Sequence, residues 1–116
     1  MSDLWEHSDR AVCTHPGWAR LRGWGAVASS WFALFQGPQQ LQFVLTEERI
    51  DVVGDVAWVS VDENLLGSQG GATVAALNVF VREPGRGAWR LVCHHGSVVS
   101  TPIEVERGGG GEASEA

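Results

Sequence analysis

Three side chains that could carry acid–base chemistry, Glu63, Asn78 and His94, lie in the second half of the chain. A carboxylate near an imidazole favours the charged imidazolium, and the pair can exchange protons near neutral pH. A buried charge without a partner costs several kcal/mol in effective terms. We therefore expect this trio either to act on a ligand or to satisfy its own hydrogen bonds and fix the register of a sheet.

Two further side chains could contact a ligand, and each has a plain alternative. His15 lies in the segment THPGW at 14–18, where Pro16 and Gly17 force a turn. The turn either aims the imidazole at the mouth of a pocket or leaves it as a hydrogen-bond partner at the end of a strand. Trp31 either forms a wall of the pocket or only packs in the core.

A metal centre and a nucleotide cofactor are not expected. His95 follows His94 directly, so on a strand the two imidazoles point to opposite faces and cannot share one ion. No further ligand stands at a useful spacing. The Gly70-Gly71 pair joins two strands and does not open a helix, as a phosphate-binding loop would. We predict no metal and no cofactor.

The elements that position these side chains can be predicted from periodicity. Trp24, Val27 and Trp31 recur at helical spacing, which predicts an amphipathic helix over 23–36, after a helical stub near Asp3 and a strand-like segment at 11–15. Four strands are predicted over 41–53, 56–67, 72–82 and 88–99, with turns at 54–55, 68–71 and 83–87. Short turns between successive strands make an antiparallel meander.

The turn lengths suggest three cross-strand pairs: Val53 with Val56, Gly67 with Ala72, and Arg82 with Ala88. These pairs place the acid–base trio on one face, where the carboxylate and the imidazole flank Ala76. The opposite face then collects mostly apolar side chains: Trp58, Leu77, Val79, Val81, Trp89, Leu91, Cys93 and His95. Because one helix covers only one face, we expect a homodimer that forms through the sheet.

Length and charge restrict the class of protein. A chain of 116 residues is one domain with a core of its own, which we place at 1–106, followed by a flexible Gly-rich acidic tail at 107–116. The net charge of −6 and the lack of a basic run argue against nucleic acid as a partner. No apolar stretch approaches a membrane span and no secretory leader is visible, so we expect a cytoplasmic protein with Cys13 and Cys93 as free thiols.

The order of these elements resembles a known family. The motifs GDVAWV at 54–59 followed by Glu63, LNVF at 77–80 and WRLVCHHGS at 89–97 together resemble the SnoaL-like branch of the nuclear transport factor 2-like superfamily, over residues 4–99. The resemblance implies an α+β fold, cone-shaped, in which a strongly curved antiparallel meander wraps around one or two helices and encloses a pocket. It also implies dimerisation through the outer face of the sheet.

The resemblance suggests two classes of function. The first is a small-molecule binding protein, or an isomerase- or cyclase-type enzyme, that holds an apolar ligand between helix and sheet. In it Glu63 would be the general base, His94 the acid or hydrogen-bond donor, and Asn78 the orienting group, with Trp31 and His15 against the ligand. The second is a non-catalytic oligomerisation module, comparable to the association domain of calcium/calmodulin-dependent protein kinase.

The chain departs from the family pattern in two respects. Relatives normally carry a long helix before the segment LWEH, which here stands at 4–7. The start is therefore truncated, or a partner covers the gap, or the cavity is wide open. Ketosteroid isomerases of this fold use a tyrosine to stabilise the developing oxyanion, and this chain contains no tyrosine, so that mechanism does not transfer intact.

Overall fold

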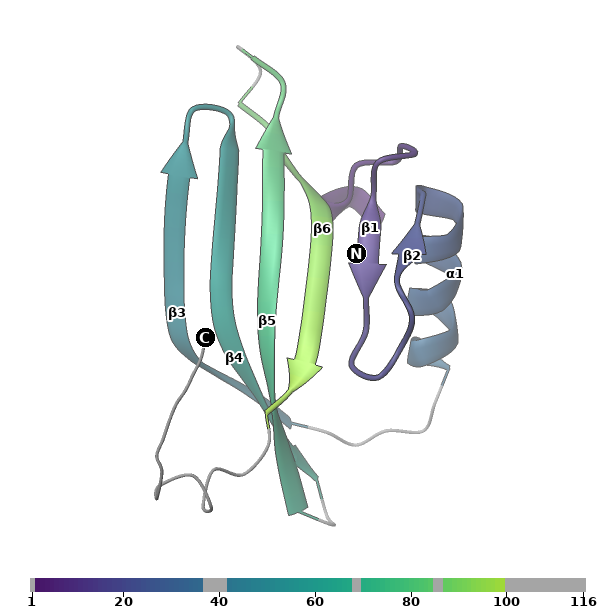
Figure 1. Ribbon diagram of the computed structural model, residues 1–116, viewed down its shortest axis with the longest axis vertical. Coiled ribbons are helices and arrows are strands. Elements are labelled where there is room, and N and C mark those ends of the chain that lie inside the picture. The colour runs from purple at the N-terminus through teal and green to yellow at the C-terminus, as the bar shows by residue number, and fades with distance from the viewer. Residues whose placement is uncertain (1, 37–41, 68–69, 85–86, 100–116) are drawn as a thin grey trace.

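The computed structural model describes residues 2–36, 42–67, 70–84 and 87–99. In chain order its elements are η1 (Ser2–Leu4), β1 (Val12–Thr14), β2 (Leu21–Arg22), α1 (Trp24–Phe35), β3 (Gln42–Val53), β4 (Val56–Gly67), β5 (Gly70–Arg82) and β6 (Trp89–Val98). The strands form one sheet in the order β2-β1-β6-β5-β4-β3 (Figure 1). The predicted α+β fold with a long meander is confirmed, but β1 runs parallel to β6, so the sheet is mixed rather than antiparallel throughout.

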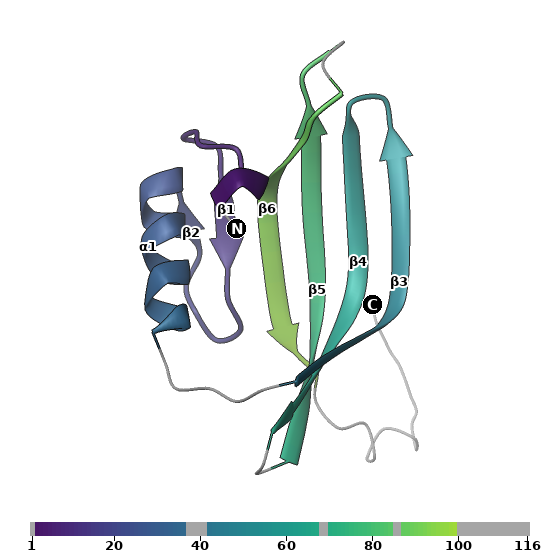
Figure 2. The same ribbon diagram turned by 180° about the vertical axis from the view of Figure 1, so that it is seen from behind.

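The predicted helix is confirmed as α1, which begins after Gly23 in a left-handed conformation (φ 87°) that a glycine adopts without strain. It lies beside β1 and β2, at the edge of the sheet opposite to β3 (Figures 1 and 2). The ladder between β3 and β4 is interrupted between Thr46 and Arg49, where Glu47 has φ 57°. Such a bulge bends a strand, and β3 bends strongly in both views.

The registers of the first two hairpins can be compared with the prediction directly. Val53 pairs with Val56, as predicted. Gly67 pairs with Gly70 and not with Ala72, because Gly70 already belongs to β5 and the turn is tighter than expected. Residues 68–69 of the predicted turn lie outside the described residues. A shift of two residues keeps every side chain on its predicted face but changes its neighbour.

The third hairpin also differs from the prediction. Arg82 pairs with Trp89 rather than Ala88, and the ladder shifts again between Val79 and Phe80. Residues 85–86 of its turn lie outside the described residues. This irregularity brings Leu91 opposite Phe80, on the face that carries the helix. It likewise places Trp89 opposite Arg82 on that face. The prediction that Leu91 and Trp89 lie on the other face is therefore wrong. An extra residue in one strand reverses the alternation beyond it.

The core lies between α1 and the β1–β6 side of the sheet. Its buried members are Trp5, Ala11, Cys13, Val27 and Leu91, and Leu21, Trp24, Trp31 and Phe80 pack against them. The segment after η1 enters this core because it forms a parallel bridge to the start of β6. The N-terminal residues are therefore part of the folded unit. No helix among the described residues is long and apolar enough to span a membrane. The predicted tail at 107–116 and the predicted end of the domain at residue 106 lie outside the described residues.

Candidate functional site

The corrected registers separate the predicted acid–base pair. Glu63 pairs with Val74, and His94 pairs with Asn78, so Glu63 and His94 do not flank Ala76 as predicted. All three polar side chains remain on the helix side of the sheet. In a flat sheet, four residues along β4 and two strand spacings correspond to about 16 Å between the Cα atoms of Glu63 and His94. The two groups therefore face the same side without touching each other.

Asn78 and His94 are direct partners across the β5–β6 ladder. His94 Nδ1 lies 2.5 Å from Asn78 Oδ1, and because a carbonyl oxygen only accepts, Nδ1–H is the donor. His94 as a whole residue is 9% exposed. Burial, reinforced by the nearby His15 and His95, lowers the pKa of His94 to about 4. The ring is therefore neutral at pH 7, with its lone pair at Nε2.

His15 and Trp31 complete the surroundings of His94. The Trp31 ring centre lies 5.4 Å from that of His94, and the His15 ring centre lies 6.4 Å from it. His15 and Trp31 meet edge to face at 4.5 Å. The structure thus brings together four of the five predicted site residues, and Glu63 is the one that stands apart.

The His15 imidazole is engaged in a hydrogen-bonded chain that ends on the helix. Ser30 Oγ donates to the carbonyl oxygen of Val27 at 2.7 Å, so His15 Nε2–H donates to Ser30 Oγ at 2.8 Å. His15 is 2% exposed, and burial lowers its pKa. This geometry matches the strand-end hydrogen bond that was one of the two expectations for His15, and it connects β1 to α1.

Ser30 and Cys13 are two members of this cluster that sequence reasoning missed. Ser30 lies three residues after Val27 on the buried side of α1, so a polar residue within the apolar stripe was the available indication. Cys13 Sγ lies 3.6 Å from His15 Nε2, and burial raises its pKa to about 12, so it stays a thiol. Cys13 and Cys93 are both free cysteines.

Glu63 lies in an apolar setting on the same side of the sheet. Leu45 and Val74 are its cross-strand neighbours. The described residues give Glu63 no ion-pair partner, and burial raises the pKa of its carboxyl group. The apolar side chains of β3 on this side are exposed: Phe43, Leu45, Ile50 and Val52. The helix-side face is therefore open at its β3 end.

A cavity of about 620 Å³ lies elsewhere, between the N-terminal segment and the β5–β6 hairpin. Its lining residues are Asp3, Trp5, Glu6, His7, Arg10, Val81, Arg82, Glu83, Pro84, Ala88 and Arg90. None of the five predicted site residues belongs to this set. Sequence reasoning missed the cavity because its walls come from two segments far apart in the sequence, within residues 3–10 and 81–90, which only the fold brings together.

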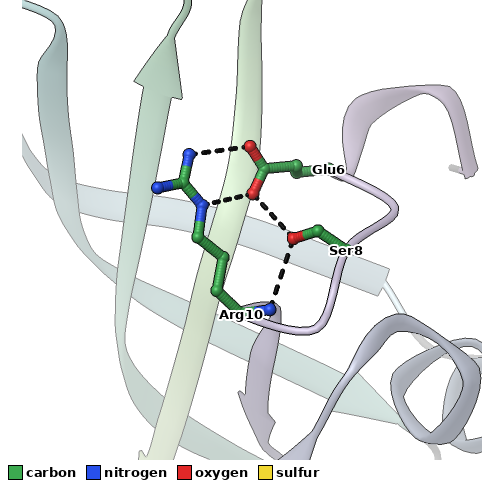
Figure 3. A network of polar contacts seen from close by, with 3 residues as sticks. All are labelled: Glu6, Ser8 and Arg10. Carbon is green, nitrogen blue, oxygen red and sulfur yellow. Dashed lines mark hydrogen bonds and ion pairs between the residues drawn. The ribbon is translucent and has the colours of Figure 1, made fainter.

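Two residues that line this cavity, Glu6 and Arg10, form an ion pair (Figure 3). Arg10 donates to both carboxylate oxygens of Glu6, at 2.6 and 2.8 Å, and Ser8 Oγ donates to Glu6 Oε1 at 2.9 Å. The hydrogen bond from Arg10 lowers the pKa of Glu6. The charges of Glu6 and Arg10 are therefore paired with each other within the loop before β1.

The predicted site residues on the helix-side face carry three kinds of polar group. They are the imidazoles of His15 and His94, the amide of Asn78 and the carboxyl group of Glu63. Across the part of the chain that the structure describes, no group of three or more His, Cys, Asp or Glu side chains could hold a metal ion.

The chain matches a known family and resembles several solved structures. A family model described as SnoaL-like domain matches residues 1–101. A structure from Streptomyces avermitilis, named as a putative dehydratase from the NTF2-like family, is 32% identical with a TM-score of 0.74, over 86% of this chain and 82% of that one. A putative calcium/calmodulin-dependent protein kinase type II association domain from Thiobacillus denitrificans is 30% identical with a TM-score of 0.77, over 86% and 80% of the two chains.

A curated relative shows a similar sequence within a longer protein. F-box protein SKIP8 from Arabidopsis thaliana is 32% identical over 99 residues, which cover 85% of this chain and 41% of that protein. The chain therefore spans less than half of the length of this relative.

Proposed function

Because the chain belongs to the SnoaL-like domain family, we propose that it binds an apolar small molecule on the helix-side face of its sheet, with His94 against the ligand. The observation that carries this proposal is the state of His94. Asn78 holds one nitrogen of a buried, neutral imidazole, and the other nitrogen makes no hydrogen bond with the described residues.

A buried polar atom normally has a partner, so an unpaired Nε2 supports a role for a ligand atom at that position. Nε2 is not among the fully enclosed unsatisfied atoms, which include Trp5 Nε1 and Thr14 Oγ1, so it retains some accessible surface. The Trp31 ring beside it offers an apolar contact. These features together fit a site in which a few polar atoms orient an otherwise apolar ligand.

Glu63 is the second polar contact that we propose for this face. Its raised pKa makes it a stronger base than an exposed carboxylate, which suits it to take a proton from a ligand. Since it stands apart from His94, a ligand that reaches both must carry polar groups at two ends. An isomerase- or cyclase-type reaction on this face would therefore use Glu63 as the base and His94 as the group that holds the far end.

Binding of 2-naphthol, a planar apolar probe with one polar group, tests the proposal. Isothermal titration calorimetry at pH 7 should give binding for the native chain and for His95→Phe, whose changed side chain lies on the opposite face. His94→Phe should weaken binding at least about tenfold, since it removes the polar contact and keeps a flat ring. Equal affinity for His94→Phe, or no binding to the native chain, would refute the proposed site.

A second candidate function is an association module, and a specific observation favours it. The relative from Thiobacillus denitrificans is named as an association domain. The outer face of the sheet of the present chain exposes apolar side chains: Val44, Val53, Val56, Leu66 and Leu77. Such a patch on a small protein indicates a protein interface, and we propose that a second copy covers it.

Sedimentation velocity tests whether the dimer forms through the outer face of the sheet or through its helix-side face. The native chain should sediment as a dimer, and Leu77→Asp on the outer face should shift it towards the monomer. Phe43→Asp, which changes an exposed side chain on the helix side, is the matched control and should leave the dimer intact. A monomeric native chain, or dissociation caused by the control alone, would contradict an interface on the outer face.

A further inference from the structure

We propose, building on the binding role above, that the ligand group against His94 is a hydroxyl that donates a hydrogen bond, as in an alcohol or phenol, and not a carbonyl oxygen. The juxtaposition of Asn78, His94 and His15 on β5, β6 and the end of β1 leads to this assignment. It names the class of ligand group that this site takes at His94 Nε2.

The first step is the tautomer of His94. A neutral imidazole has one N–H donor and one acceptor nitrogen. The Nδ1–H of His94 points to Asn78 Oδ1, which can only accept, so Nε2 carries the lone pair. A ligand atom at Nε2 must therefore bring the hydrogen itself.

The second step is the charge of His94, because an imidazolium would donate from both nitrogens. None of the ion pairs among the described residues involves His94. The titratable groups that act on its pKa are two other histidines, one on its own strand and one directly after β1, and both disfavour a positive charge. The neighbouring thiols of Cys13 and Cys93 have raised pKa values and stay neutral. Burial acts in the same direction, so the ring stays neutral at physiological pH.

The third step is the neighbouring imidazole, which could have supplied a donor in place of His94. The hydrogen on His15 Nε2 is used by Ser30 Oγ, and the Ser30 hydrogen is used by the Val27 carbonyl. Neither His15 nor Ser30 has a hydrogen left for a ligand.

A carbonyl oxygen at His94 Nε2 would face lone pair against lone pair and would lose its hydrogen bonds with water on entry. A hydroxyl at the same place replaces a bond to water by a bond to Nε2. An analogue that lacks the hydroxyl leaves the acceptor Nε2 without a hydrogen bond, and this lowers its affinity more than the loss of the same apolar contact area would. The affinity should therefore depend on whether the ligand carries a hydrogen-bond donor, and not on the size of the ligand.

Three naphthalenes of similar shape test this: 2-naphthol, 2-methoxynaphthalene and 2-acetylnaphthalene, titrated at pH 7 by calorimetry. The native chain should bind 2-naphthol at least about tenfold more tightly than either analogue. In Asn78→Asp the carboxylate still accepts from Nδ1 but favours the imidazolium, which turns Nε2 into a donor. This variant should lose the preference for 2-naphthol and gain affinity for 2-acetylnaphthalene. Asn64→Asp makes the same chemical change on the opposite face and should keep the native preference.

A spectroscopic readout checks the tautomer without any ligand. In ¹⁵N-labelled protein, the Nε2 resonance of His94 should be of the unprotonated, pyridine type, and in Asn78→Asp it should move to the protonated, pyrrole type. A pyrrole-type Nε2 in the native chain would overturn the assignment. Equal affinities for all three naphthalenes would overturn it too, while leaving the proposed binding function intact. No binding of any of them would overturn both.

Discussion

Burial of neutral His94 should make the free energy of unfolding depend on pH, and His94→Asn should remove that dependence. The pKa of His94 is lowered from 6.5 to about 4 in the folded chain. The unfolded chain therefore takes up a proton that the folded chain refuses between these two values. Stability from this group is present above pH 6.5 and is lost as the pH falls towards 4.

The magnitude follows from the two pKa values. Between pH 7.5 and pH 4.5 the linkage relation gives a loss of about 2.5 kcal/mol for this one group. The group is almost fully buried, so screening by solvent reduces this value little. Asn at position 94 keeps an amide nitrogen near the position of Nδ1, where it can still donate to Asn78 Oδ1, but it does not titrate.

Urea unfolding of both chains at the two pH values measures the difference. His15 and Glu63 also have shifted pKa values and are present in both chains. The contribution of Glu63 cancels when the variant is subtracted, and that of His15 cancels except for its electrostatic coupling to His94. The native chain should lose about 2.5 kcal/mol more than the variant on acidification. If both chains lose the same amount, His94 is not a buried neutral group in the folded chain, and its lone pair is not the recognition element of the site.

Three further predictions concern packing, charge and thiols. Gly96→Ala should lower the free energy of unfolding by about 1–3 kcal/mol, because the added Cβ would lie 2.9 Å from a methyl group of Val74 on β5. The control Gly25→Ala in α1, where an added Cβ meets no atom within 4 Å, should not lower the free energy of unfolding. Equal denaturation midpoints for the two variants would contradict this packing. Glu63→Gln should raise the free energy of unfolding at pH 7, by an amount that shrinks as the pH falls and the native carboxyl becomes protonated; a loss of stability in urea unfolding would instead indicate a structural contact. Iodoacetamide at pH 8 should alkylate half-buried Cys93 before buried Cys13, as peptide mass spectrometry would show, and the reverse order would contradict the burial of Cys13.

Most of the secondary structure could be predicted because it depends on local patterns. The spacing of Trp24, Val27 and Trp31 defines α1, and alternation with short turns defines the four long strands. The faces of Glu63 and Asn78 were also predictable, because the register error between β4 and β5 was two residues and an even shift preserves the face.

The contacts within the site could not be predicted in the same way. The partner of His94 depends on where the turns close and on an irregularity between Val79 and Phe80, and neither leaves a clear pattern in the sequence. The bond from His15 to Ser30 joins residues 15 positions apart on different elements. Such contacts depend on packing over the whole fold, where an error of one or two residues replaces every neighbour.

The sequence by itself determined which residues are apolar, where the helix and the long strands run, and that polar groups share the helix side of the sheet, because these properties repeat along the chain with the period of each element. Only the tertiary structure decided that β1 runs parallel to β6, that Leu91 faces the core, and that His94 is held by Asn78 rather than placed against Glu63. The physical reason is that a hydrogen bond requires two atoms within about 3 Å, and distances of that size are set by registers and bulges and not by periodicity.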